Sequence, residues 1–213
     1  MKKFIETLKN CWKVEDLRQR LLITILFVAI YRFGSFVVLP GINPSQLDTL
    51  QKQTSGGLMS LLDMFSGGAF SNASIFALGI MPYISASIVM QLLAVAVPYF
   101  QKMQREGESG RKKINWYTRA LTVVILLFQA PSYLINLKMQ AEGALASGIS
   151  WSVFMIPATI ILAAGSMFVL WLGERITDKG VGNGISLIIM IGIIARLPQA
   201  FIQEAGSRLE AIA

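Results

Sequence analysis

GGLMSLLDMFSGGAFSNASIFALGIMPYISASIVMQLLAVAV, residues 56–97, is the stretch that decides the fold of this chain. It begins with a short apolar run at 58–65, which is interrupted by Asp63 and closed by Ser-Gly-Gly. That run cannot cross a bilayer, which takes about 20 apolar residues, whereas residues 75–97 can, although they include Pro82. Irregular backbone at membrane depth is tolerated only where protein or a water-filled cavity covers it. The pattern therefore predicts a membrane protein in which a short segment at membrane depth can move and open a cavity.

Composition agrees with a membrane protein and argues against catalysis. The 213 residues are 54% hydrophobic and 15% charged, whereas soluble domains carry about 25% charged residues. The chain has no histidine and one cysteine, Cys11, which excludes Ser-His catalysis, the usual zinc sites and an internal disulfide. Asp63 is the one acid at possible membrane depth, so no carboxylate pair is available for acid–base chemistry. We expect no catalytic residue, metal or cofactor.

Five apolar segments predict five transmembrane helices, and a basic amphipathic segment at 1–20 precedes them. The first contains Arg32, whose cost of about 2.5–3.5 kcal/mol at the bilayer centre is outweighed by an apolar sum on the order of −6 kcal/mol. We interpret its side chain as snorkelling or facing the bundle. Polar loops are expected at 98–119 and 173–184. The expected spans are 21–39, 75–97, 120–137, 151–172 and 185–202.

The positive charges alternate between the two sides of the predicted bundle. The N-terminal segment and the loops on its side hold 14 Lys and Arg residues, against 4 on the other side. By the positive-inside rule the N-terminus is cytoplasmic and residues 57–70 re-enter from the outer side. This distribution makes the net charge of +7 an orientation signal rather than a nucleic-acid-binding face.

Four stretches of the chain resemble the SecY family, the channel subunits of the bacterial Sec protein translocon. In order they are RFGSFVVLPGI (32–42), MFSGGAFSNASIFALGIMPYISASIVMQLL (64–93), EGESGRKKI (106–114) and MFVLWLGERITDKGVGNGIS (167–186). The resemblance implies an all-α integral membrane protein with five transmembrane helices and a short re-entrant plug helix. Residues 1–213 would be the N-terminal half of a ten-helix, pseudo-symmetric channel. We expect no conduction from this half alone.

The resemblance assigns roles that spacing alone would not. Ile80 and Ile84 lie four residues apart, as do Ile185 and Ile189, and this spacing by itself predicts core packing or contact with lipid. The resemblance implies instead that these four belong to an apolar pore ring, which closes without bonding to a passing chain. Residues 57–70 would be a weakly packed plug with glycine pairs as hinges on both sides. The plug residues are Leu58, Leu61, Leu62, Met64, Phe65, Gly67 and Gly68.

Polar residues on the second span have two interpretations. Ser85, Ser87 and Gln91 are typical of interhelical hydrogen bonding, and the resemblance implies that they border a lateral gate. The charged segment at 106–113 is an orientation signal or a contact for a motor or ribosome.

The function that the resemblance implies is transport without enzymatic activity. Unfolded secretory polypeptides would cross the bacterial cytoplasmic (inner) membrane, and membrane segments would leave laterally into the lipid bilayer. The implied partners are SecE, SecG, the SecA motor ATPase, the ribosome, signal sequences and nascent polypeptides, with no direct reading of nucleic acid. The alternative is a small-solute secondary transporter with broken helices, which would place polar or ionisable ligands at the midplane. A structural membrane scaffold would leave the plug unexplained.

Overall fold

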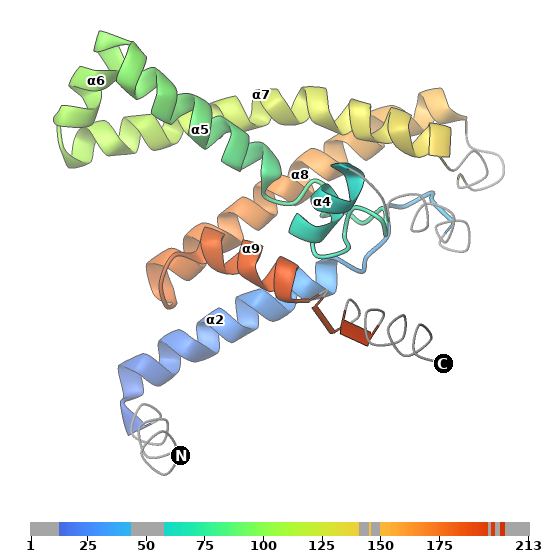
Figure 1. Cartoon of the computed structure of the whole chain (residues 1–213), viewed down its shortest axis with the longest axis horizontal. Coiled ribbons are helices and arrows are strands. Elements are labelled where there is room, and N and C mark those ends of the chain that lie inside the picture. The colour runs from blue at the N-terminus through green and yellow to red at the C-terminus, as the bar shows by residue number, and fades with distance from the viewer. Residues whose placement is uncertain are drawn as a thin grey trace, which may run out of the picture.

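Helices make up the described part of the chain. The computed structural model describes residues 13–43, 58–140, 145, 150–195, 197–198 and 201–202 (Figure 1). No strand forms among them, and β pairing there is confined to two isolated bridges, Val38 with Ser74 and Ile42 with Leu145. The predicted all-helical class is confirmed. The helices in this part are α2 (Glu15–Gly34), α4 (Leu58–Phe65), α5 (Met81–Ala96), α6 (Pro98–Arg105), α7 (Glu108–Gln140), α8 (Trp151–Lys179) and α9 (Gly184–Ile194).

Two of the described helices, α7 and α8, are long and apolar enough to cross a membrane. The pair α5 and α6 satisfies the same criteria only when both arms are counted together, and these arms meet at a bend of 98°. The 20-residue α2, with three arginines, and the 11-residue apolar α9 do not satisfy them. The structure therefore supports two to three spans, and the expectation of five remains a prediction.

The chain leaves α2 earlier than the expected span at 21–39 because it pairs with the segment that follows α4. The Leu39 N–H donates to the Ala73 carbonyl at 2.9 Å, and the Ile75 N–H donates to the Val37 carbonyl at 2.9 Å. These bonds hold residues 37–39 in an extended course, so the helix ends at Gly34.

The expected span at 75–97 is helical only from Met81 onward. The residues before it, 66–80, form successive turns, and Gly79 there has a φ of +51°. Pro82 lies in the first turn of α5, where its missing N–H leaves no helical hydrogen bond unmade. The proline therefore begins a helix rather than interrupting one.

The segment 98–119, predicted as a loop, is helical. Val97 is extended and Pro98 opens α6, while Gly107, with a φ of +76°, makes the turn into α7. A proline at the first position and a left-handed glycine are ordinary helix boundaries. Polarity was mistaken for irregular structure here, because the charged residues occupy solvated helix faces.

Polar contacts form between and within the two helices of the hairpin, α6 and α7. A hydrogen bond with Tyr117 raises the pKa of Tyr99, and Lys112 Nζ lies 2.9 Å from Glu108 Oε1 one helical turn away. Both partners of that ion pair are exposed, so it contributes only about 0.3–0.5 kcal/mol. The hairpin is thus a solvated extension of the apolar helices.

The segment 173–184, also predicted as a loop, is mostly an extension of α8, which leaves only residues 180–183 as a turn. The Asn183 side chain caps α9 by accepting from two backbone N–H groups, at 3.1 and 3.2 Å. Gly184 lies so close to the Gly173 carbonyl that a Cβ would overlap it. The glycine therefore allows α9 to start directly against α8.

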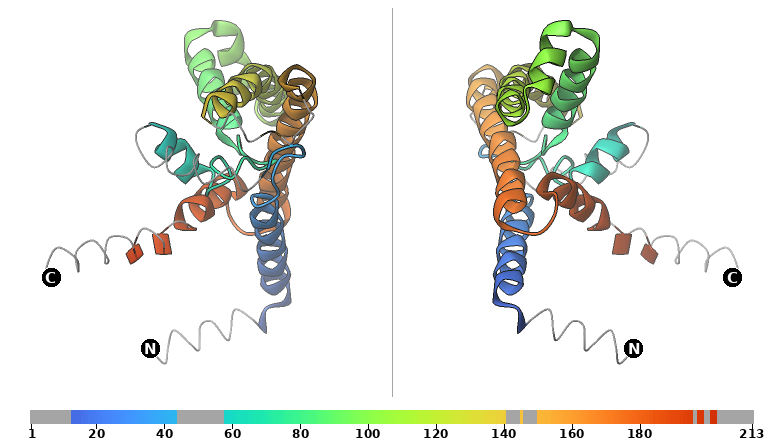
Figure 2. Two further views of the ribbon diagram at one scale, coloured as in Figure 1. Left: turned by 90° about the vertical axis from the view of Figure 1, so that its right-hand side faces the viewer. Right: turned by 90° about the vertical axis from the view of Figure 1, so that its left-hand side faces the viewer.

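The helices pack into two hydrophobic clusters. One joins α7 and α8 to the residues that follow the plug, and the other joins α2, α8, α9 and the start of α5. Both views of Figure 2 show α4 and α9 projecting to the same side of α2 and α8. This arrangement places the short helix α4 against α9, which it contacts.

Candidate functional site

The four isoleucines expected in a pore ring meet in one hydrophobic cluster. Ile80 precedes α5 and is 5% exposed, and Ile84 follows one turn later. Ile185 and Ile189, from the first two turns of α9, are half-buried against the same cluster. The structure brings the four together, and their role as a ring stays a prediction. With them, Tyr31, Phe76, Val169, Leu172, Ile176 and Ile188 form what we call the waist cluster.

The predicted plug contains the short helix α4, which ends against α9 (Figure 1). Leu62 packs half-buried against the hydrophobic cluster of α7 and α8, whereas Met64 and Phe65 are 39% and 37% exposed. The glycines at 56–57 and the side chains of Leu58 and Leu61 lie outside what the structure describes. The described part of α4 is thus packed on one face only.

Two glycines turn the chain back after α4, in residues 66–70, which we call the plug turn. Gly67 and Gly68 have φ values of +65° and +93°, a region that glycine enters without strain. A Cβ on Gly67 would lie 3.0 Å from the Gly192 Cα of α9, and a Cβ on Gly192 would lie 2.8 Å from the Phe65 carbonyl oxygen. The glycines therefore permit both the turn and a close backbone contact, and their role as hinges stays a prediction.

Asp63 organises the plug turn from a buried position, where it is 2% exposed. Its Oδ1 accepts from the Ser71 N–H at 2.8 Å, and its carbonyl accepts from the Gly68 N–H and the Ser66 hydroxyl, both at 3.0 Å. The part of the chain that the structure describes holds no group of three or more His, Cys, Asp or Glu residues that could bind a metal. The carboxylate therefore has a structural role in this turn.

We expect Asp63→Ala to loosen the plug turn, because it leaves the buried Ser71 N–H without its acceptor, a loss of about 1–3 kcal/mol. Asp63→Asn keeps an acceptor oxygen at this position and should retain most of the protection. Hydrogen–deuterium exchange of amides 66–71 in the full-length protein measures the difference. Equal exchange in the wild type and Asp63→Ala would contradict the assignment.

Two residues of α2 that the sequence analysis did not place in the site contact the plug turn. The Tyr31 hydroxyl donates to the Ser66 carbonyl at 3.4 Å, and Arg32 Nη1 donates to the Gly67 carbonyl at 3.0 Å. Of the two interpretations of Arg32, the structure favours the one that faces the bundle. The sequence signal for this contact was the charge of Arg32 inside an apolar stretch, because such a charge needs a polar partner.

The far end of the plug turn is held by α7. The hydroxyl of the buried Tyr133 donates to the Phe70 carbonyl at 2.9 Å, and the two rings meet edge to face with centroids 4.8 Å apart. The sequence carries no signal for this contact, because a tyrosine in an apolar helix is equally typical of a core.

The three residues expected at a lateral gate fall on two faces of α5. Ser85 lines a cavity of about 300 Å³ between the plug turn, α5 and α7. Ser87 and Gln91 lie outside that lining, and Gln91 Nε2 donates to the Ser87 hydroxyl at 3.3 Å on the helix surface. The structure thus separates Ser85 from the other two. The cavity is mostly apolar, with polar groups from Gln129, Ser132, Tyr133 and Asn136.

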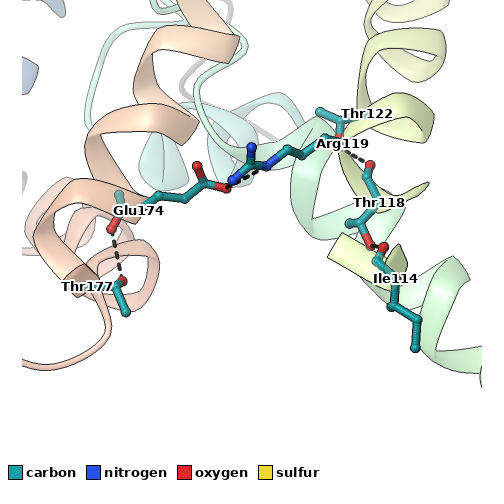
Figure 3. A network of polar contacts seen from close by, with 7 residues as sticks. Ile114, Thr118, Arg119, Thr122, Glu174 and Thr177 are labelled. Atoms are coloured by element: carbon teal, nitrogen blue, oxygen red, sulfur yellow. Dashed lines mark hydrogen bonds and ion pairs between the residues drawn. The ribbon is translucent and has the colours of Figure 1, made fainter. Parts of the chain in front are cut away.

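A second, polar cavity of about 270 Å³ borders the waist cluster, since Ile185 lines it together with Tyr83, which packs against that cluster. Arg119 of α7 reaches Glu174 of α8 across it, with Nη2 and Nε at 2.7 and 2.9 Å from Oε1 (Figure 3). The arginine is half exposed, so the pair contributes at most about 1 kcal/mol to stability. Its main effect is to fix the distance between two long helices beside the isoleucines.

Comparison with known proteins gives consistent matches. The family model described as SecY matches residues 74–211. The protein translocase subunit SecY of Pseudomonas aeruginosa is 47% identical over 194 residues, which cover 90% of this chain and 42% of that protein. The subunit of Escherichia coli K12 is 47% identical over 87% of this chain and 42% of its own length. The subunit of Thermotoga maritima is 42% identical over 94% of this chain and 47% of its own length. The chain spans about half the length of the curated relatives it matches.

Proposed function

This chain belongs to the SecY family, and from that membership we propose that it is the N-terminal half of a protein-conducting channel. The channel passes unfolded secretory polypeptides across the membrane and releases membrane segments sideways into lipid. The curated relatives are named protein translocase subunits, a name that describes transport and specifies no reaction. We therefore assign the chain no catalytic role.

The observation that carries the proposal is the meeting of the four isoleucines beside a re-entrant helix. Side chains from α5 and α9, far apart in sequence, converge in the waist cluster, and the plug turn packs on α9 at Gly192, close beyond Ile189. Apolar, β-branched side chains exclude water and ions when they close a constriction. They also make no directional bond, which suits a passage for chains of any sequence.

In the proposed closed state, the plug supports the seal from the outer side. α4 rests on α9, while its turn is bonded to α2 through Tyr31 and Arg32 and to α7 through Tyr133. On this proposal a passing chain displaces α4, because the helix and its turn pack on α9 close beyond Ile189. A small-solute transporter would instead need polar ligands among these residues, whereas the waist cluster is built from apolar and aromatic side chains.

The membrane setting and the partners extend the same proposal. α2, α5, α7, α8 and α9 would supply the five transmembrane segments in the bacterial cytoplasmic membrane, with the N-terminus in the cytoplasm. SecE and SecG would be the membrane partners, and SecA or the ribosome would drive movement. The cavity that Ser85 lines would border the lateral gate for signal sequences.

Cross-linking to a stalled secretory polypeptide tests the proposed path. In the full-length protein with Cys11 replaced by serine, we expect Phe65→Cys and Ile189→Cys to form disulfides with cysteines placed along the stalled chain. Ile156→Cys is the matched control, since Ile156 is 70% exposed on α8 and should face lipid. No adduct at 65 or 189, or equal adducts at 156, would contradict the path and favour the transporter.

A further inference from the structure

We infer that Arg32 is a positioning residue that latches the plug turn shut, and that the plug pivots next to Phe70 when it is displaced. The inference rests on the proposed function for what displacement achieves. The contacts that support it lie at the two ends of the plug turn and differ in kind.

The latch is a single charge-assisted contact at one end of the plug turn. Arg32 Nη1 donates to the Gly67 carbonyl at 3.0 Å, and a charged donor makes this bond about twice as strong as a neutral one. The guanidinium carbon also lies 5.4 Å from the centre of the Phe36 ring, just beyond the end of α2, which holds the group in place. A Cβ on Gly67 would lie only 2.7 Å from Nη1, so a side chain at this position would displace the guanidinium.

The other end of the plug turn is anchored by several contacts at once. Phe70 is buried and receives both a hydrogen bond and an edge-to-face ring contact from Tyr133. The chain then pairs with residues 37–39 through the bonds at Ala73 and Ile75. Releasing this end would break a buried cluster. Releasing the Gly67 end would break the two hydrogen bonds from α2, made by Tyr31 and Arg32, together with the bonds to Asp63 that cross Gly68 within the turn.

The residue between latch and anchor permits the motion. Gly68 has a φ of +93°, and glycine passes between backbone regions that other residues reach with strain. The plug turn meets α9 at Gly67 and Gly192, two residues that have no side chain of their own to interlock. The geometry therefore gives the plug turn one fixed end, at Phe70, and one releasable end, at Gly67, next to α4.

The test measures the position of α4 directly, without relying on transport. Spin labels go on Met64→Cys of α4 and Ile25→Cys of α2 in the full-length protein with Cys11→Ser, because both native side chains are exposed. We expect Arg32→Met to raise the population with a longer separation by about tenfold to a hundredfold. Arg32→Lys, which keeps a charged donor, should restore most of the short distance. Arg20→Met is the matched control, since that arginine pairs with Asp16 on the exposed surface of the same helix.

The outcomes separate the latch from the proposed function. An unchanged distance distribution in Arg32→Met, or the same change in Arg20→Met, overturns the latch. A lengthened distance in Arg32→Met that Arg32→Lys reverses supports the latch, whatever the ion leak. If the resting ion leak through vesicles stays constant while the distance lengthens, the latch stands and the result counts against the plug as part of the seal. Should Arg32→Met fail to fold, Arg32→Gln keeps a neutral donor, and we expect an intermediate population whose absence overturns the inference.

Discussion

Replacing Ile80, Ile84, Ile185 and Ile189 with glycine in the full-length protein should raise the resting ion leak of reconstituted vesicles by roughly tenfold or more. The four side chains fill the waist cluster from two helices, and their removal would leave an opening that water can enter. A hydrophobic constriction blocks ions because it is dry, so wetting it removes the barrier. Leak is read from the decay of an imposed potassium gradient.

The matched control uses four isoleucines whose side chains are exposed, two of them on the same helices. Ile88 of α5, Ile194 of α9, and Ile156 and Ile160 of α8 are between 49% and 70% exposed. Their replacement by glycine carries the same helix penalty, about 1 kcal/mol per residue, yet should leave the leak near that of the wild type. Equal leak in both quadruple variants would mean that the seal does not lie at the waist cluster.

The second large effect is expected from a single methyl group at Gly165. This glycine is buried on α8, and a Cβ there would overlap the Ile75 carbonyl and lie 3.3 Å from the Phe76 ring. The Ile75 backbone cannot shift freely because its N–H is bonded to the Val37 carbonyl. We expect Gly165→Ala to lower the free energy of unfolding by about 2–3 kcal/mol, since the gain in helix propensity, about 1 kcal/mol, is smaller than the cost of separating packed backbones.

Thermal unfolding of the full-length protein in detergent measures this difference. Ala164→Val is the control, because Ala164 is the exposed neighbour on the same helix and a change there should stay within about 0.5 kcal/mol. A Gly165→Ala midpoint equal to that of the wild type would show that α8 and the turn at Ile75 are not in close contact.

The helical class and the convergence of the isoleucines could be predicted for different reasons. Long apolar runs identify helices because backbone groups in a bilayer must be satisfied within the segment. The isoleucines were singled out by family resemblance, since their spacing alone is equally typical of a core or a lipid face. The structure adds that both pairs share one cluster, which periodicity within a single helix cannot reveal.

The errors lie where polar sequence was taken for irregular structure. Both segments are rich in charge, yet residues 98–119 form α6 and the start of α7, and most of residues 173–184 continue α8. Hydropathy identifies the part of a helix that is apolar, whereas hydrogen bonding and capping determine where the helix ends. Asn183 and Gly107 were the local boundary signals, and both follow from turn and cap chemistry.

The plug contacts were the least predictable part of the site. Arg32 was visible as an unexplained charge, but its partner is a backbone carbonyl 35 positions away, and any residue presents such a group. Tyr133 and Gly192 gave no signal, because an aromatic residue or a glycine in an apolar helix is common. Contacts with the backbone depend on the path of the chain rather than on residue type.

The close contact between the backbones of Gly67 and Gly192 also bears on how the proposed channel would close again. In the proposed channel these two backbones could part and rejoin without repacking of side chains between them, while Tyr31 and Arg32 would re-form their bonds to the plug turn beside this contact. The proposed plug would then return without repacking at this contact, whereas a larger residue at either glycine would hold the two backbones apart.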